Sequence, residues 1–97
     1  MDIDIKSSEA IHNNVEIYLK GIDEGEVILI KHEDKITIDV MDGQDITLNS
    51  DISMSDIHKK LDTYIPTMKY GEIRIIKKEG KTAIKVNNRN REYMNRE

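Results

Sequence analysis

The hydrophobic positions of residues 53–64 recur with the spacing of one face of an α-helix, as the pair Ile57 and Leu61 illustrates. Ser53 is a favourable N-cap residue. Pro66 ends the pattern, because proline moves the residue before it out of helical geometry. The sequence therefore predicts an α-helix over Ser53–Tyr64.

After this helix, alternating polar and apolar residues predict a β-hairpin over Glu72–Asn87. Ile73 and Ile75 alternate with Arg74 in its first strand, and the Glu79–Gly80 pair is suited to the turn. The hairpin is therefore expected to have one aliphatic face and one basic face.

Before the helix, the pattern predicts a meander of short strands. Glu26–Lys31 contains an unbroken aliphatic run, which is typical of a strand buried on both faces. Lys35–Met41 alternates apolar and polar residues, and the Asp42–Gly43 pair that follows is a strong signal for a tight turn. Asp45–Asn49 is then expected to return as a short strand.

The segment Ser7–Lys20 fits two patterns. Apolar residues at positions 11, 15, 18 and 22 would share one face of a helix, whereas those at positions 15, 17 and 19 alternate as in a strand. Two consecutive asparagines would lie in the middle of the helix, where asparagine is unfavourable. We therefore favour a short helical turn at Ser7–His12 followed by a strand at Val15–Lys20, with a helix as the alternative.

Together these elements predict an α+β fold, in which an antiparallel sheet of about five or six strands packs one face on the helix over residues 53–64. A single globular domain is expected over residues 1–87, followed by a polar, basic tail over residues 88–97. No internal repeat is evident. The residues expected in the core are Leu29, Ile38, Ile57, Leu61, Ile75 and Ile84.

The composition excludes several classes of protein. Of the 97 residues, 37% are hydrophobic and 35% are charged, which is too apolar for a disordered chain and too polar for a membrane protein. No apolar run approaches the roughly 18 residues of a spanning helix. The start of the chain, MDIDIK, is unlike a signal or transit peptide, and the chain has no cysteine. We expect a cytoplasmic protein.

No residue pattern indicates catalysis or a bound cofactor. The three histidines, His12, His32 and His58, are far apart in the sequence and lack the spacing of metal ligands. Each glycine stands alone, so there is no phosphate-binding loop, and no serine lies in a nucleophile elbow. We therefore expect a protein that is not an enzyme and that uses no metal or other cofactor.

The net charge of −4 conceals an uneven distribution. Residues 1–68 contain fifteen acidic and six basic residues, whereas residues 69–97 contain four acidic and nine basic residues. If Val15–Lys20 is a strand, an up-and-down meander brings two acidic turns to one end of the sheet. Acidic turns that serve only solubility are the competing interpretation. The residues predicted to form this acidic partner-binding surface are Asp23, Glu24, Glu26, Asp42 and Asp45.

The C-terminal part provides a second candidate surface, which is basic. It would bind the phosphates of a nucleic acid, or it would pair with the acidic part of the same chain or of a second copy. The competing interpretation is a solvated sheet face whose lysines protect an exposed edge from aggregation. The isoelectric point of about 5.4 and the scarcity of aromatic residues argue against a dedicated nucleic-acid-binding protein. The residues of this surface are Arg74, Lys77, Lys78, Lys81, Lys85, Arg89 and Arg91.

The leading functional hypothesis is a non-enzymatic protein-binding module that uses its acidic surface to bind a partner protein with a basic surface. Richness in Ile, Lys and Asn suggests an A+T-rich genome. One form of this hypothesis is therefore a phage or mobile-element factor that binds or inhibits a nucleic-acid-handling host protein. The alternatives are nucleic-acid binding through the basic hairpin and tail, a homo-oligomer, and a less favoured small ribonuclease toxin.

Overall fold

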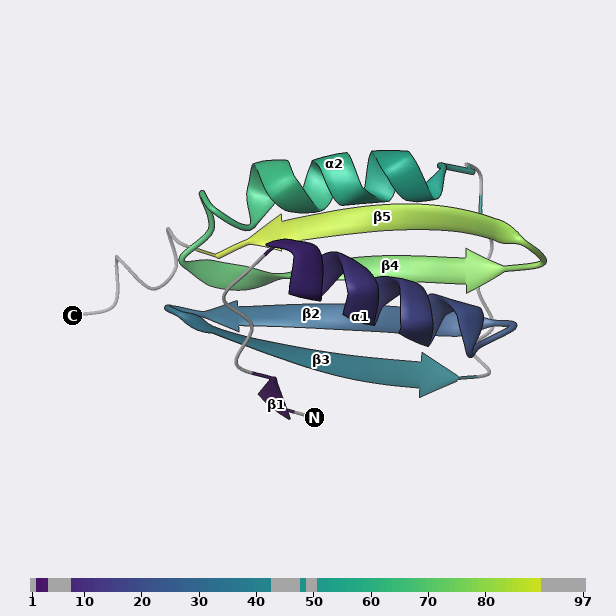
Figure 1. The fold of residues 1–97 in the computed structure, drawn as a ribbon, viewed down its shortest axis with the longest axis horizontal. Helices are drawn as coiled ribbons and strands as arrows, with labels where there is room; N and C mark the ends of the chain where they lie inside the picture. Colours follow the sequence, from purple (N-terminus) through teal and green to yellow (C-terminus); the bar gives the residue numbers. More distant parts are fainter. Residues whose placement is uncertain (1, 4–7, 43–47, 49–50, 90–97) are drawn as a thin grey trace.

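The computed structural model describes residues 2–3, 8–42, 48 and 51–89, and it shows the predicted α+β fold (Figure 1). The described part contains two helices and one sheet of antiparallel strands in the order β1-β3-β2-β4-β5. The elements are β1 (Asp2–Ile3), α1 (Ser8–Lys20), β2 (Gly25–His32), β3 (Lys35–Asp42), α2 (Met54–Tyr64), β4 (Tyr70–Lys78) and β5 (Lys81–Asn88).

Both helices pack on the same face of the sheet, and the hydrophobic core lies between the two layers (Figure 1). Burial of aliphatic side chains between these layers is the main stabilising contribution to the fold. Of the six predicted core residues, five are buried, and Ile84 on the edge strand β5 is partly buried against them. Two rows of residues cross the sheet on this face, Val40, Val27, Ile75 and Ile84 in one and Ile38, Leu29, Ile73 and Val86 in the other.

The opposite face of the sheet, called the second face below, consists of the alternate residues of the same strands and carries neither helix. Ile28 and Ile76 are buried there, whereas Ile30 is 41% exposed and Met41 is 42% exposed. Strand β2 is therefore buried on its core face, as predicted, but only in part on its second face.

The favoured strand at Val15–Lys20 is wrong, because this segment belongs to helix α1. Val15 and Leu19 are both buried in the helix and would also share one face of a strand, so Ile17 distinguishes the two structures. In the helix Ile17 points to solvent and is 66% exposed, while Ile11 and Val15 are buried one turn apart. The side chain of Asn14 donates a hydrogen bond to the backbone oxygen of Ala10, which accommodates asparagine inside the helix.

Helix α2 and the C-terminal hairpin are confirmed. The Ser53 hydroxyl accepts a hydrogen bond from the backbone N–H of Asp56 at 3.1 Å and caps the helix, as predicted. At the hairpin turn, Glu79 and Gly80 both have positive φ, as a tight two-residue turn with the right-handed strand twist requires.

An internal repeat that sequence inspection missed relates the two halves of the sheet. Displacing the chain by 46 residues superimposes α1, β2 and β3 on α2, β4 and β5 in sequence order. Eight of the sixteen residues of segment 25–40 are identical to their counterparts in segment 71–86, beginning with a shared Gly-Glu pair. The repeat is hidden because aliphatic residues replace one another at several positions and because a few polar positions differ, as where Lys85 stands in place of Asp39.

The contacts follow the same repeat as the sequence. Lys31 on β2 donates from Nζ to the backbone oxygen of Ile65 at the end of α2, at 2.6 Å. Its counterpart Lys77 on β4 donates to the oxygen of Leu19 in the last turn of α1, at 2.8 Å. Because a cation at a helix C-terminus satisfies free carbonyls and opposes the helix dipole, each half secures the helix of the other half. The two halves are thus arranged as a pseudo-twofold pair.

Three predicted segments fall wholly or partly outside the described residues. They are the turn at Asp42–Gly43 beyond its first residue, the strand at Asp45–Asn49 and the tail beyond Arg89. Within the described part, Arg89 continues the hairpin, since its backbone N–H donates to the oxygen of Tyr70 at 2.9 Å. Neither described helix has the length and apolar character needed to cross a membrane.

Candidate partner-binding surfaces

The fold gathers part of the predicted acidic surface at one end of the sheet. Asp23 and Glu24 lie in the connection between α1 and β2, and Asp42 ends β3 directly opposite Gly25. Asp45 lies outside the described residues. Glu26 is separate from this end surface, because it is buried on the second face, with 5% of its surface exposed.

Lysines from β4 reduce the negative charge at this end. Lys78 Nζ lies 3.9 Å from a carboxylate oxygen of Glu24. Lys77 reaches the core side of the same end, where it donates to the backbone of α1. Because the partner charges come from the same chain, the end is a mixed surface and not a continuous acidic one.

Most of the predicted basic surface is likewise paired within the chain. Arg74 lies between two carboxylates on the second face, with 3.1 Å to Glu72 and 3.5 Å to Glu26. The hydrogen bond and the charge of Glu72 raise the pKa of the Arg74 guanidinium above its ordinary value. Arg89 lies 3.9 Å from the same Glu72 carboxylate. Arg91 lies outside the described residues.

Two predicted cations, Lys81 and Lys85, are exposed on β5 and have no ion pair within the described part of the chain. Both lie on the second face, since the register places Lys85 opposite Arg74 and Lys81 opposite Lys78. Segment 81–89 contains no acidic residue. The described edge strand therefore carries only positive formal charges.

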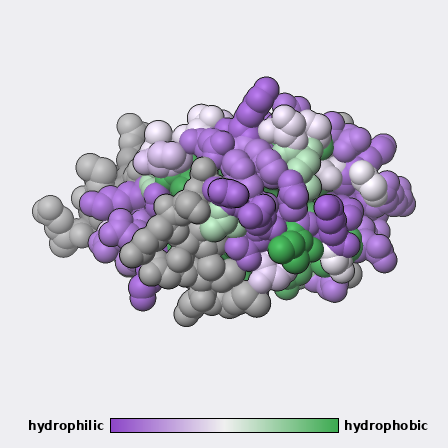
Figure 2. Space-filling model, in the orientation of Figure 1, coloured by the Kyte–Doolittle hydropathy of each residue, from purple (hydrophilic) through white to green (hydrophobic). Residues whose placement is uncertain are grey.

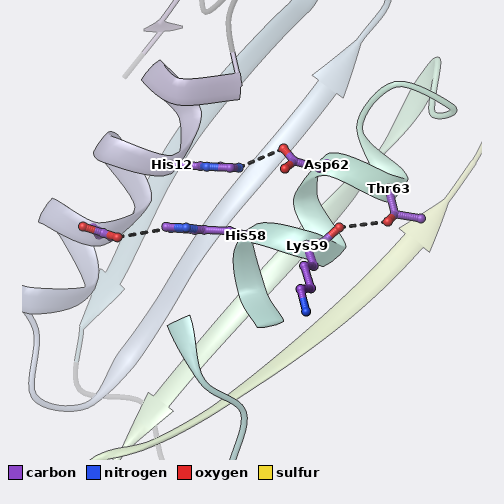
Figure 3. Close-up of polar contacts among 6 residues, drawn as sticks. His12, His58, Lys59, Asp62 and Thr63 are labelled. Atoms are coloured by element: carbon purple, nitrogen blue, oxygen red, sulfur yellow. Dashed lines mark hydrogen bonds and ion pairs between the residues drawn. The ribbon is translucent and has the colours of Figure 1, made fainter. Parts of the chain in front are cut away.

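The fold brings together two histidines that are far apart in the sequence. His12 on α1 and His58 on α2 project toward one another, with ring centroids 4.0 Å apart and ring planes at 4° (Figure 3). Nε2 of His12 lies 2.9 Å from the Asp62 carboxylate on α2, and Nε2 of His58 lies 3.3 Å from the Glu16 carboxylate on α1. The 46-residue repeat relates these two pairs. Their sequence signal is a His followed four residues later by an acidic residue, a pattern that occurs once in each half of the repeat.

This histidine cluster connects the two helices. Each Nε2 atom faces a carboxylate of the same chain rather than an open cavity. No group of three or more His, Asp or Glu side chains in the described part is arranged to hold a metal ion. The described residues also form a hollow between the β2–β3 turn and the α2–β4 connection, where Glu33 and Asp34 are mixed with Lys31 and Lys69. Its opposing charges select no particular ligand.

The edge strand β5 has an open hydrogen-bonding side. The backbone N–H of Thr82 donates to the Asp51 carboxylate at 3.1 Å, and its oxygen accepts from the N–H of Ile52 at 2.9 Å. Thr82 therefore points its backbone groups away from β4. Because these groups alternate along an antiparallel strand, those of Ile84 and Val86 point outward too. Within the described part of the chain, neither Ile84 nor Val86 has a hydrogen-bond partner on that side.

The helix layer presents a different surface. Its visible side is mostly hydrophilic, with hydrophobic side chains in small separate areas (Figure 2). Exposed apolar residues on the two helices are Ile17 on α1 and Tyr64 on α2. Isolated apolar residues of this kind are common on protein surfaces, so the open edge of β5 is the more distinctive feature.

Comparison with known proteins found no matching family model, no significantly similar curated protein and no significantly similar solved structure.

Proposed function

We propose that this chain is a non-enzymatic protein-binding module that binds an extended segment of a partner protein along β5. The observation that supports the proposal is the pair of outward-facing residues, Ile84 and Val86, whose backbone groups have no partner on that side among the described residues. Strand addition to an open sheet edge is a common mode of peptide recognition, in which backbone hydrogen bonds supply affinity and the flanking side chains supply specificity.

The proposal moves the binding surface from the acidic end to β5. The carboxylates of Glu24 and Glu26 already have cationic partners in the chain, so a basic partner would have to displace Lys78 and Arg74. That Asp23 and Asp42 make secondary contacts with the partner protein remains a prediction. In this proposal the chain acts in the cytoplasm, and a phage or mobile-element factor would use the edge to bind or inhibit a host protein.

Site-specific photocrosslinking tests this function. We expect benzoylphenylalanine at Asn87, an exposed residue of β5, to form an adduct with one partner protein in cells of the source organism. The matched control is the same substitution at Lys59, which is exposed on α2. A discrete, nuclease-resistant protein adduct that forms at position 87 and not at position 59 supports the proposal. Equal labelling at both positions, adducts with nucleic acid alone, or no adduct at either position contradicts it.

A further inference from the structure

The two edges of the sheet are counterparts in the repeat, and each receives a short Asp-Ile segment of the chain itself. On one edge, Asp2–Ile3 forms β1 and pairs antiparallel with Thr37 and Ile36 of β3. On the other edge, Asp51 and Ile52 bond to Thr82 of β5, the counterpart of Ile36 in the repeat. Each edge therefore already accommodates one extended segment in which an acid precedes an aliphatic residue.

The two edges differ in one outward-facing backbone N–H farther along the strand. On β3, the N–H of Val40 donates to the carboxylate of its own neighbour, Asp39, at 3.1 Å. On β5 the counterparts are Val86 and Lys85. An ammonium group accepts no hydrogen bond, so the N–H of Val86 is left open beside a positive charge. The chain therefore caps this backbone N–H with a carboxylate on β3 but not on β5.

The side chains along the open part of β5 define what fits there. On the core face, Ile84 and Val86 are partly buried against the core and offer an apolar strip. On the second face, Lys85 is exposed, and the carboxylates nearest to it across the register are already shared by Arg74. A strand paired here places alternate side chains on these two surfaces.

We infer that the open edge of β5 binds an extended segment of a partner protein in which aliphatic residues alternate with Asp or Glu. The inference rests on the proposed protein-binding function and specifies the chemistry of the partner. The aliphatic side chains of the segment cover Ile84 and Val86, and its carboxylates approach Lys85. Its backbone continues the row of hydrogen bonds that Asp51 and Ile52 begin at Thr82.

A second copy of the chain is a poorer occupant of this edge. Two β5 strands related by a twofold axis near their centre would bring the Lys85 side chains of the two copies close together, and like charges facing across strands are unfavourable. Pairing β5 of one copy with β3 of another would place Lys85 near Asp39, but β1 already occupies part of that edge.

Binding of synthetic heptapeptides to the full chain, followed by fluorescence anisotropy, tests the inference. We expect a peptide that alternates isoleucine with aspartate to bind, and one that alternates isoleucine with lysine to bind at least about tenfold more weakly. Lys85→Asp supplies the missing carboxylate as on β3 and reverses the charge, so it should also weaken binding at least about tenfold. Asp39→Asn, at the counterpart position on the other edge, should leave the affinity unchanged.

Backbone methylation separates strand addition from simple charge attraction. N-methylation of one alternate set of residues should abolish binding, and methylation of the other set should preserve it, because only one set directs its N–H groups toward β5. Equal affinity for the acidic and basic peptides, or binding that survives both methylations, would overturn the inference. A concentration-dependent dimer that Lys85→Asp dissociates would overturn it as well, in favour of a second copy.

The failure of this inference can be distinguished from failure of the proposed function. If the crosslink at position 87 captures a partner protein that the aspartate peptide does not displace, the protein-binding function stands and the chemistry assigned to the partner is wrong. If neither the crosslink nor any peptide gives a signal, both proposals are wrong.

Discussion

Replacing Ile75 with alanine is expected to lower the free energy of unfolding by about 4 kcal/mol. Ile75 has 0% of its surface exposed, and it lies in the core-face row between Val27 of β2 and Ile84 of β5. Its loss leaves a cavity in a layer where strands from both halves of the repeat meet. Because a domain of this size has a total stability of about 5–15 kcal/mol, the variant should lose a large part of its stability and unfold at a much lower urea concentration. Urea denaturation followed by circular dichroism measures the change.

The matched control for this variant is Ile17→Ala on α1. The same side-chain atoms are removed, but Ile17 is exposed and alanine is the better helix former, so the stability should stay equal or rise slightly. A loss below about 1.5 kcal/mol for Ile75→Ala, or similar losses for both variants, would contradict the placement of the core.

The second large effect is expected for Gly25→Ala, which should cost about 3 kcal/mol. Gly25 begins β2 with φ at +154°, and a Cβ atom placed there would lie 2.1 Å from the backbone oxygen of Met41 on β3. The strand backbone would have to move, since no flexible side chain can yield. The repeat counterpart Gly71 has φ at +157° and a similar approach, 2.5 Å to the oxygen of Asn87. Thermal denaturation of both variants should therefore show comparable losses.

Gly21→Ala is the control for the glycine variants. An added Cβ at Gly21 meets no atom closer than 3.5 Å, so its stability should change by less than about 1 kcal/mol. If Gly25→Ala is as stable as Gly21→Ala, the close approach of β2 to β3 at this end of the sheet is wrong.

Local pattern was sufficient for most of the fold. Helix α2, strands β2 to β5 and five of the six named core residues follow from spacing along short segments. The strand predicted within α1 is wrong because Val15 and Leu19 fit both the four-residue spacing of a helix face and the two-residue spacing of a strand face. Only the exposure of Ile17, which depends on the packed sheet, decides between them.

The candidate surfaces were less predictable, because their charges are paired across elements distant in the sequence. Arg74 meets Glu26 only because β4 lies beside β2, a neighbour relation that skips β3 and α2. The open side of β5 depends likewise on the strand order. The repeat was the sequence signal that would have indicated both the strand order and the open side of β5. It suggests a pseudo-twofold sheet with β2 and β4 at its centre and β5 toward its edge.

Residue-resolved amide hydrogen exchange of the full chain tests most directly the claim that β5 presents an open edge. The amides of Ala83 and Lys85 face β4, and those of Ile84 and Val86 face outward. We predict that the amides of Ile84 and Val86 exchange much faster than those of Ala83 and Lys85, and that they become protected when a partner segment binds. Equal, strong protection of all four amides in the free chain would show that the edge is already closed, and it would contradict the proposed mode of binding.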